Sequence, residues 1–307
     1  MKHYDIIGDI HGCADQLEEL LLAMGYQKKS RCYQHPERSV IYLGDFIDRG
    51  PKQKGTLDIV RPMIEEGAAL SIMGNHEFNA ICYATKKDEH SYVREHDGDK
   101  NDSQHAAFLE EYPIGSQNYR DAIAWFKTLP VFLDLGDLYI VHACWCQNSI
   151  SLLSDRLNAD NTLQDSAYLA YADKDSNEHS ALEVLLKGPE LPLPKALHFN
   201  DTDGHPREDA RIRWWVDNEL PTSERLEFGG ADLNQTQLDA LQKLELPPQS
   251  ALPDRPVFFG HYWLKGKPAI QTNLAACVDY SVAKEGKLVA YRWSGEAELT
   301  DKNFFWI

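Results

Sequence analysis

The chain has 307 residues, of which 43% are apolar, and a formal net charge of −17. A chain of this length can bury one substantial core, and its acidic balance excludes a general affinity for nucleic-acid polymers, which requires clustered lysine and arginine. No apolar run approaches the roughly 20 residues that a membrane-spanning helix needs, so we expect no membrane partner.

The cysteines show no regular framework spacing, and the first expected strand begins almost at the first residue. The cysteines are Cys13, Cys32, Cys82, Cys144, Cys146 and Cys277. The start of the chain leaves no room for a signal peptide, and we therefore expect reduced thiols in a cytoplasmic protein.

Five apolar runs along the chain read as buried strands, and each is followed at once by polar side chains. The first run, Ile6-Ile7, is followed by Gly8-Asp9-Ile10-His11-Gly12, and the second, 39–43, by Gly44-Asp45-Phe46-Ile47-Asp48-Arg49-Gly50. The third run, 70–73, is followed by Gly74-Asn75-His76-Glu77. The last two runs end before a histidine: 138–141 before His142, and 257–259 before Gly260-His261. Ligands in open α/β sheets bind at the carboxyl ends of the strands. We therefore expect these polar side chains to meet at one sheet edge.

Helices are predicted between these strands. Asp15 with Glu18 predicts a capped helix that ends at Gly25, and Thr56 predicts the cap of a second helix, which Pro62 should kink or divide. A third helix follows Gly74.

The middle and the end of the chain give weaker patterns. We expect a polar surface loop over 86–102, helices over 106–112 and 119–129, and a hairpin of 131–135 with 138–141. Region 149–255 is the hardest to interpret, with short helices near 163–171, 181–186 and 235–244. Strands are expected over 269–273, 276–279 and 288–293.

Six residues at the ends of the predicted strands offer oxygen and imidazole donors. They are Asp9, His11, Asp45, Asn75, His142 and His261. This donor set is expected for two hard or borderline divalent cations such as Mn, Fe, Zn or Mg, and a carboxylate such as Asp45 can bridge both. Two cations roughly 3.5–4 Å apart can activate water for attack on phosphorus.

The ordered segments GDIHG, GDFIDRG and GNHE, followed by two separate histidines, resemble the signature of calcineurin-like metallophosphoesterases of the phosphoprotein-phosphatase type. The bacterial branches of this type include protein phosphatases and diadenosine-tetraphosphate hydrolases. The resemblance extends from Gly8 to His261. It implies an α/β (α+β) fold, a four-layer α/β/β/α sandwich with mixed central sheets. Because division would split the ligand set, we expect one domain over 1–307, with 149–255 as an insertion that shapes the substrate cleft.

The resemblance also implies roles for individual residues. Asp9, His11 and Asp45 would hold one metal ion, and Asp45, Asn75, His142 and His261 the other, with Mn the expected metal. His76 would be the general acid with Asp48 as its carboxylate partner. Arg49 and Asn75 would contact the phosphate. The second phosphate-binding arginine would be Arg211 or Arg213, with a slight preference for Arg213.

One segment departs from the pattern of the protein phosphatases. They have two glycines after the histidine that matches His142, whereas this chain has Ala143-Cys144-Trp145-Cys146. Bulk at this position is expected to reshape the floor of the cleft. Cys144 and Cys146 are expected to pack in the core, because a thiolate zinc site would need a second pair.

These features predict an enzyme that hydrolyses phosphomonoesters, such as phosphoproteins or small phosphorylated molecules, through in-line attack by a metal-bridging hydroxide. A second hypothesis is hydrolysis of dinucleoside polyphosphates such as diadenosine tetraphosphate, with a base stacked on Trp145, Trp214, Trp215 or Tyr262. A third is a catalytically idle metal-binding adaptor, which would have no need of His76, Asp48 and Arg49.

Overall fold

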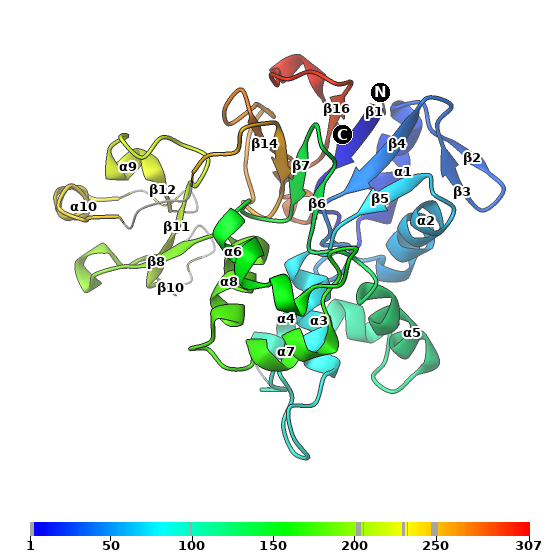
Figure 1. Ribbon diagram of the computed structural model, residues 1–307, viewed down its shortest axis with the longest axis horizontal. Coiled ribbons are helices and arrows are strands. Elements are labelled where there is room, and N and C mark those ends of the chain that lie inside the picture. Colours follow the sequence, from blue (N-terminus) through cyan, green and yellow to red (C-terminus); the bar gives the residue numbers. More distant parts are fainter. Residues whose placement is uncertain are drawn as a thin grey trace.

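Two β-sheets lie face to face at the centre of the computed structural model, which describes residues 3–98, 100–200, 204, 206–228, 231, 233–246 and 251–307 (Figure 1). The first sheet has the order β15-β16-β1-β4-β5, with β17 paired to β16. Its strands are β1 (His3–Ile7), β4 (Arg38–Tyr42), β5 (Ala69–Ser71), β15 (Asp279–Tyr280), β16 (Lys287–Trp293) and β17 (Phe304–Trp306). The sheet is mixed, because β1, β4 and β5 are parallel and β16 is antiparallel to β1.

The second sheet has the order β14-β13-β7-β6 and is also mixed. Its strands are β6 (Phe132–Asp134), β7 (Tyr139–Val141), β13 (Val257–Phe259) and β14 (Ala275–Cys277). Strands β7, β13 and β14 are parallel, and β6 with β7 forms the expected antiparallel hairpin. The predicted hairpin is therefore confirmed.

Alternate residues of the strands face the two sides of each sheet, which makes four layers. One apolar cluster lies between the sheets and contains Ile6, Ile41, Ile140, Phe258, Val289 and Tyr291. The neighbouring residues of the same strands, among them Ile7, Val40, Tyr42, Val141 and Phe259, join a larger cluster that includes the helices. This alternation is the period-two pattern of strands, and it places helices outside both sheets. The expected α/β/β/α architecture is confirmed.

The helices of the outer layers follow the strands closely in the chain. They are α1 (Ala14–Ala23), α2 (Gln53–Glu65), α3 (Asn75–Ala84), α4 (Lys100–Glu111), α5 (Gln117–Phe126), α6 (Gln147–Leu152), α7 (Asp165–Tyr171) and α8 (Asn177–Lys187). Within the residues that the structure describes, no helix combines the length and the apolar character needed to cross a membrane.

Two predicted helix caps are wrong, although both helices form. Helix α1 has no side-chain cap, because the carboxylate of Asp15 pairs with Lys52 at 2.7 Å and Glu18 accepts a hydrogen bond from Tyr33. Helix α2 begins at Gln53, before Thr56, and continues through Pro62 without a break in the assignment. Long-range partners therefore displaced the local capping chemistry that the sequence favours.

The segments after residue 80 agree with the predictions to different degrees. The polar segment 86–98 is mostly exposed, but α4 begins at Lys100, earlier than predicted. The predicted strand over 269–273 is wrong, because only an isolated bridge at Thr272 forms there. The predicted strand over 276–279 is two strands, β14 and β15, which belong to different sheets on either side of Val278.

A lobe extends from the second sheet and lies at the left of Figure 1. It contains β8 (Glu190–Pro192), β11 (Asp209–Ile212), β12 (Leu226–Glu227), α9 (Thr222–Arg225) and α10 (Gln235–Leu241), together with the two-stranded pair β9 (Phe199–Asn200) and β10 (Pro206–Arg207). The described part of the lobe has its own apolar cluster, which includes Leu197, Ile212 and Leu226. Residues 201–203, 205, 229–230, 232 and 247–250 of the expected insertion lie outside the described residues. A further hairpin, β2 (Gln27–Lys29) with β3 (Cys32–Gln34), follows α1.

Candidate metal centre and active site

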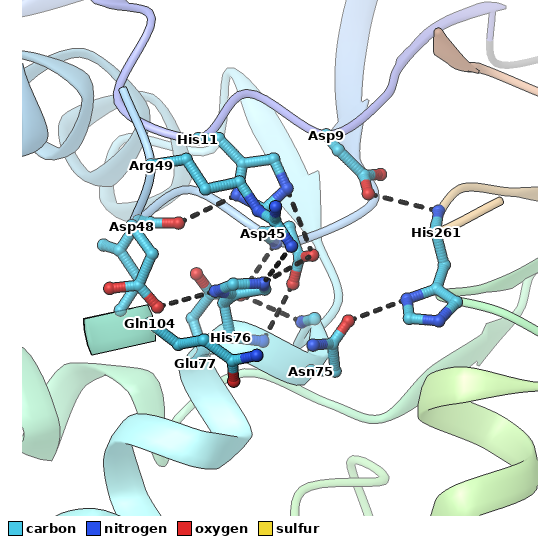
Figure 2. Close-up of polar contacts among 12 residues, drawn as sticks. Asp9, His11, Asp45, Asp48, Arg49, Asn75, His76, Glu77, Gln104 and His261 are labelled. Atoms are coloured by element: carbon cyan, nitrogen blue, oxygen red, sulfur yellow. Dashed lines mark hydrogen bonds and ion pairs between the residues drawn. The ribbon is translucent and has the colours of Figure 1, made fainter. Parts of the chain in front are cut away.

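Five strands end at the same place and bring together all six of the predicted metal-binding residues. Asp9 and His11 follow β1, Asp45 follows β4, and Asn75 begins α3 after β5. His142 follows β7 and His261 follows β13 of the second sheet. Strands β1 and β4 are parallel in the first sheet, and β7 and β13 are parallel in the second, so the carboxyl ends of each pair lie at one edge of their sheet. Figure 2 shows most of these side chains converging there.

Short distances connect these residues across both sheets. Nε2 of His11 and Nε2 of His142 each lie 3.5 Å from Oδ2 of Asp45. The backbone N–H of His261 donates to Oδ2 of Asp9 at 3.1 Å, and Oδ1 of Asn75 lies 3.0 Å from Nε2 of His142. Asp45 is therefore central to the cluster, and all six residues are at least 93% buried.

The ring nitrogens of the histidines are arranged as in metal sites. Nδ1 of His11 donates to the carbonyl of Ile47 at 2.9 Å, and Nδ1 of His142 donates to the carbonyl of Leu43 at 2.7 Å. A histidine that ligates a metal through one ring nitrogen commonly donates the other N–H to such an acceptor. Nε2 of each ring is thereby left as the potential ligand atom.

Several buried atoms of this cluster have no hydrogen-bond partner among the described residues. They are Oδ1 of Asp9, Nε2 of His11 and Nε2 of His261. Two groups bring potential ligand atoms within 4.8 Å of one another, His11 with Asp45 and His76, and Asp45 with His142 and His261. Asp9 belongs to neither of these groups, and His76, predicted as the general acid, belongs to the first. Because unpaired buried polar atoms are costly, the donors present fit divalent cations, which these residues would hold.

The pKa shifts of the clustered residues are also consistent with a cation site. Burial, together with the nearby Asp279 and Asp45, raises the pKa of Asp9 well above its ordinary value. Burial lowers the pKa of His11 to about 3, with His76 adding to the effect, so this imidazole is neutral, as a metal ligand must be. The pKa of His142 moves the other way, to about 10, because the nearby carboxyl groups of Asp45 and Asp9 outweigh the effect of its burial. A buried cluster of carboxyl and imidazole groups whose pKa values are displaced in this way is an environment that a divalent cation stabilises.

Glu77 and two glycines determine the shape of the ligand turns. The buried carboxylate of Glu77 accepts the N–H groups of Asp45 and Phe46 at 2.8 Å and that of Gly74 at 3.0 Å. A Cβ atom at Gly74 would overlap the carboxylate of Asp45, and one at Gly260 would overlap that of Asp9. These two glycines are therefore required by the close approach of the turns to the carboxylates of Asp45 and Asp9.

Left-handed backbone conformations are concentrated in these turns. His11, Asp45, Asp48, Arg49 and His261 have φ values between 47° and 70°. Non-glycine residues in this region are strained by about 1 kcal/mol or more each, and such strain persists where the surrounding structure holds it for a function.

His76 and Asp48 form the predicted pair beside the six clustered donor residues. Nδ1 of His76 lies 2.6 Å from Oδ2 of Asp48, and the backbone N–H of Asp48 donates to Gln53 at 2.7 Å. Burial opposes ionisation of Asp48, but its hydrogen bonds with His105 and His76 lower its pKa to about 2. Asp48 is thus a carboxylate that orients His76, with Nε2 of His76 on the other side of the ring. Gln53 and His105 were not predicted from the sequence.

Arg49 lies against His76 and an indole ring. Its Nη2 is 3.4 Å from Nε2 of His76, and its guanidinium lies 3.8 Å from the ring centre of Trp263. The backbone N–H of Trp263 donates to Oδ2 of Asp279 at 2.7 Å, which ties the indole to the site. Trp263 and Asp279 were also missed, although Trp263 follows His261 by only two residues and could have been found by that proximity.

Comparisons with known proteins agree with this geometry. The family model described as calcineurin-like phosphoesterase matches residues 3–261. The chain belongs to the calcineurin-like phosphoesterase family. The expected resemblance is therefore confirmed for most of the chain.

Members of the family and similar solved structures are known from several organisms. The chain is 47% identical over 73 residues to a bis(5'-nucleosyl)-tetraphosphatase of Oceanobacillus iheyensis, which covers 24% of this chain and 29% of that protein. The corresponding protein of Bacillus subtilis is 42% identical over 74 residues, with 24% and 30% covered. The chain thus matches less than a third of the length of these curated relatives.

Two solved structures share the fold of this chain. A protein serine/threonine phosphatase from Saccharomyces cerevisiae superposes with a TM-score of 0.53 at 16% identity, over 100% of this chain and 79% of that one. A cold-active protein-tyrosine phosphatase from a Shewanella species gives 0.51 at 15% identity, over 96% and 79%. At these identities the likeness concerns the fold.

The two candidate arginines of this family member occupy different surroundings. Nη1 of Arg211 donates to the carbonyl of His261 at 3.3 Å. Arg213 contacts residues of the lobe, because Nη2 pairs with Oε2 of Glu227 at 2.7 Å and Nη1 donates to the carbonyl of Glu224. Arg211 also has an acidic partner in the lobe, since its Nε lies 3.5 Å from Oε1 of Glu190. The geometry therefore favours Arg211, and the slight preference for Arg213 finds no support in these contacts.

The aromatic residues that were candidates for base stacking are buried in the core instead. Trp145, Trp214, Trp215 and Tyr262 are each at most 7% exposed. Trp145 stacks on Tyr139 with 3.9 Å between ring centres, so the bulk after His142 packs away from solvent. Cys144 and Cys146 are also buried, and neither belongs to the potential metal-binding groups found among the described residues.

Proposed function

We propose that this chain is a dinuclear-metal-dependent phosphoester hydrolase that acts on phosphomonoesters in the manner of a serine/threonine protein phosphatase. One observation carries the proposal: a buried cluster of six donor residues lies directly beside the His76–Asp48 pair and Arg49. The metal ligands of the proposal are Asp9, His11, Asp45, Asn75, His142 and His261. Manganese is the metal we propose, with iron, zinc or magnesium as alternatives.

In the proposed reaction, the metal ions and the residues around them would have separate roles. Two bound divalent cations would supply an activated water molecule and neutralise charge on the phosphate. Arg49 presents a fork of donors that matches phosphate oxygens, and Asn75 and Arg211 lie where they can add further contacts. His76, oriented by Asp48 through Nδ1, would donate a proton from Nε2 to the departing alkoxide.

A dinucleoside polyphosphate hydrolase is the second candidate. The named activity of the curated relatives favours it, because they are bis(5'-nucleosyl)-tetraphosphatases. Burial of the four aromatic candidates removes the base-stacking surface that this hypothesis predicted. We therefore keep phosphomonoesters as the first proposal.

The test compares substrates directly. Purified protein is loaded with Mn²⁺ and given p-nitrophenyl phosphate, a phosphoserine peptide and diadenosine tetraphosphate at equal concentrations. We expect faster phosphate release from the monoesters. Faster cleavage of diadenosine tetraphosphate would favour the second candidate, and no hydrolysis of any of them would contradict both.

An idle metal-binding adaptor is a less economical interpretation. The pairing of His76 with Asp48 and the nearby guanidinium of Arg49 serve proton donation and anion binding, which an adaptor does not need. Replacement of His76 by alanine should lower turnover and leave the metal content unchanged.

We also propose that the protein lies in the cytoplasm, where buried thiols such as those of Cys82 and Cys277 remain reduced.

A further inference from the structure

A second histidine reaches the carboxylate of Asp48 from a different helix. Nδ1 of His105, on α4, lies 3.0 Å from Oδ1 of Asp48, while Nδ1 of His76 lies 2.6 Å from Oδ2. His105 is only 4% exposed, and Asp48 only 2%. Both oxygens of this buried carboxylate are therefore occupied, each by an imidazole.

The ring of His105 is held in place by its surroundings. It stacks on Phe108 of the same helix with 5.0 Å between ring centres and lies 5.2 Å from the ring of Tyr83 on α3. Helix α4 is fixed at both ends, because Asp102 accepts a hydrogen bond from Tyr83 and Glu111 accepts the N–H of Gln53 at the start of α2. His105 therefore approaches Asp48 from a rigid support.

The chemistry of the three groups fixes their proton positions. A carboxylate only accepts hydrogen bonds, so Nδ1 of His105 and Nδ1 of His76 must both carry hydrogen. With one oxygen held by His105, the carboxylate cannot rotate to offer the other oxygen elsewhere. His76 is then confined to one ring orientation, with Nε2 on the side of Arg49, 3.4 Å from its guanidinium.

We propose that His105 is a positioning residue that holds the Asp48 carboxylate and, through it, orients His76 for proton donation to the leaving group. The proposal rests on the function proposed above. It goes further, because it adds a third member to the acid pair and places that member on α4. The alternative is that His105 only fills space and stabilises α4.

Leaving groups of different basicity separate these two roles. Phenyl phosphate needs a proton on its departing oxygen, whereas 2,4-dinitrophenyl phosphate does not. We expect His105→Leu to lower kcat for phenyl phosphate by about 10- to 100-fold, the usual range for loss of such a supporting partner, and to change kcat for 2,4-dinitrophenyl phosphate by about twofold or less. An equal loss for both substrates, or no loss, would contradict the proposal.

Conservative variants cover the possibility that His105→Leu does not fold. The amide nitrogen of asparagine can occupy the place of Nδ1, whereas that of glutamine lies one bond further from the backbone. His105→Asn should recover most of the activity towards phenyl phosphate and His105→Gln should not. Equal activity of the two variants would overturn the positioning role.

His96 offers a matched control in the same aromatic cluster. It stacks on Tyr83 with 3.8 Å between ring centres, and its Nε2 bonds to the carbonyl of Tyr83. His96→Leu should leave the ratio of the two kcat values unchanged. In a His76→Ala background, His105→Leu should have no further effect on phenyl phosphate, because the acid is already absent. An additional loss in this background would contradict the proposal.

A readout without turnover keeps this inference separate from the proposed function. In samples in which the His76 ring is neutral, nitrogen-15 NMR should show its remaining proton on Nδ1 alone in the unmodified protein and in His105→Asn, and distributed between Nδ1 and Nε2 in His105→Leu. A protein without phosphatase activity but with this tautomer pattern would contradict the function alone. An unchanged tautomer in His105→Leu would contradict the inference alone.

Discussion

At the scale of single residues, the orientation of Arg49 depends on what lies beneath it. Arg49 has a left-handed backbone, and its guanidinium rests on the indole of Trp263. Trp263 in turn has a φ of 55° and is held through its backbone by Asp279. Stacking removes water from one face of the guanidinium and leaves its edge available for phosphate oxygens.

This arrangement predicts a specific defect for Trp263→Leu. Loss of a cation–π contact worth about 1 kcal/mol should raise KM for p-nitrophenyl phosphate about fivefold, with kcat changed by about twofold or less. Steady-state kinetics measure both values. Trp263→Phe should retain part of the effect, and Trp306→Leu, a change at an exposed tryptophan of β17, should have none. A fall in kcat at constant KM would contradict this role.

At the scale of elements, α4 supports the site by capping its neighbour. Both carboxylate oxygens of Glu111 accept backbone N–H groups at the start of α2, from Gln53 at 2.7 Å and Lys54 at 2.9 Å. Helix α2 follows the turn that carries Asp45, Asp48 and Arg49, so its first turn determines where that turn ends. A carboxylate at a helix N-terminus also interacts favourably with the helix dipole.

We therefore expect Glu111→Ala to lower the free energy of unfolding by about 1 kcal/mol, as measured by urea denaturation. The neighbouring Glu110 is exposed and provides the matched control. Glu110→Ala should change the free energy by about 0.5 kcal/mol or less. Equal effects of the two substitutions would show that the capping contact contributes nothing.

The strands and the site residues at their ends could be predicted because the signal is local. An apolar run, a glycine and a ligand-type side chain lie next to one another at Asp9, Asp45 and Asn75. What could not be predicted depends on partners far away in the chain. Asp15 binds Lys52 rather than capping α1, and His105 reaches Asp48 across 57 positions. No periodicity in a single sequence reveals such pairings.

The sequence also cannot tell which aromatic side chains are buried in the core and which line a binding surface. The tryptophans proposed for base stacking, such as Trp214, are as apolar in a binding surface as in a core, so composition cannot separate the two. The structure resolves this because Nε1 of Trp214 donates to the carbonyl of Ala143 at 2.8 Å inside the core. The predicted strand over 269–273 does not form, because the backbone N–H groups of Gln271 and Thr272 donate to the carbonyl of Ala275 nearby in the chain.

At the scale of the whole molecule, the lobe between His142 and His261 brings an arginine close to a group of buried carboxylates. The chain carries a net charge of −17, and five carboxylates are buried near the site: Asp9, Asp45, Asp48, Glu77 and Asp279. Arg211 reaches His261 from β11 of the lobe. We propose that the insertion 149–255 acts in this way, as part of the substrate cleft.

Arg211 in β11 and Arg213 directly after it give a matched pair of variants. Arg211→Ala should raise KM for phosphate esters about tenfold, because a charge-assisted contact to phosphate is lost. Arg213→Ala should leave KM unchanged, since Arg213 pairs with Glu227. Steady-state kinetics with a phosphoserine peptide measure the difference. A larger rise in KM for Arg213→Ala would restore Arg213 as the phosphate-binding residue.

The metal content per chain tests the central claim most directly, because the proposed site depends on cations that Asp45 would share. Protein is freed of metal with a chelator, loaded with Mn²⁺, separated from unbound metal and analysed by mass spectrometry of the elements. We predict two ions per chain for the unmodified protein and for Asp137→Asn, a change at an exposed carboxylate. Asp45→Asn should hold fewer than one. An unmodified chain without bound metal, or an Asp45→Asn variant with two ions, would contradict the account.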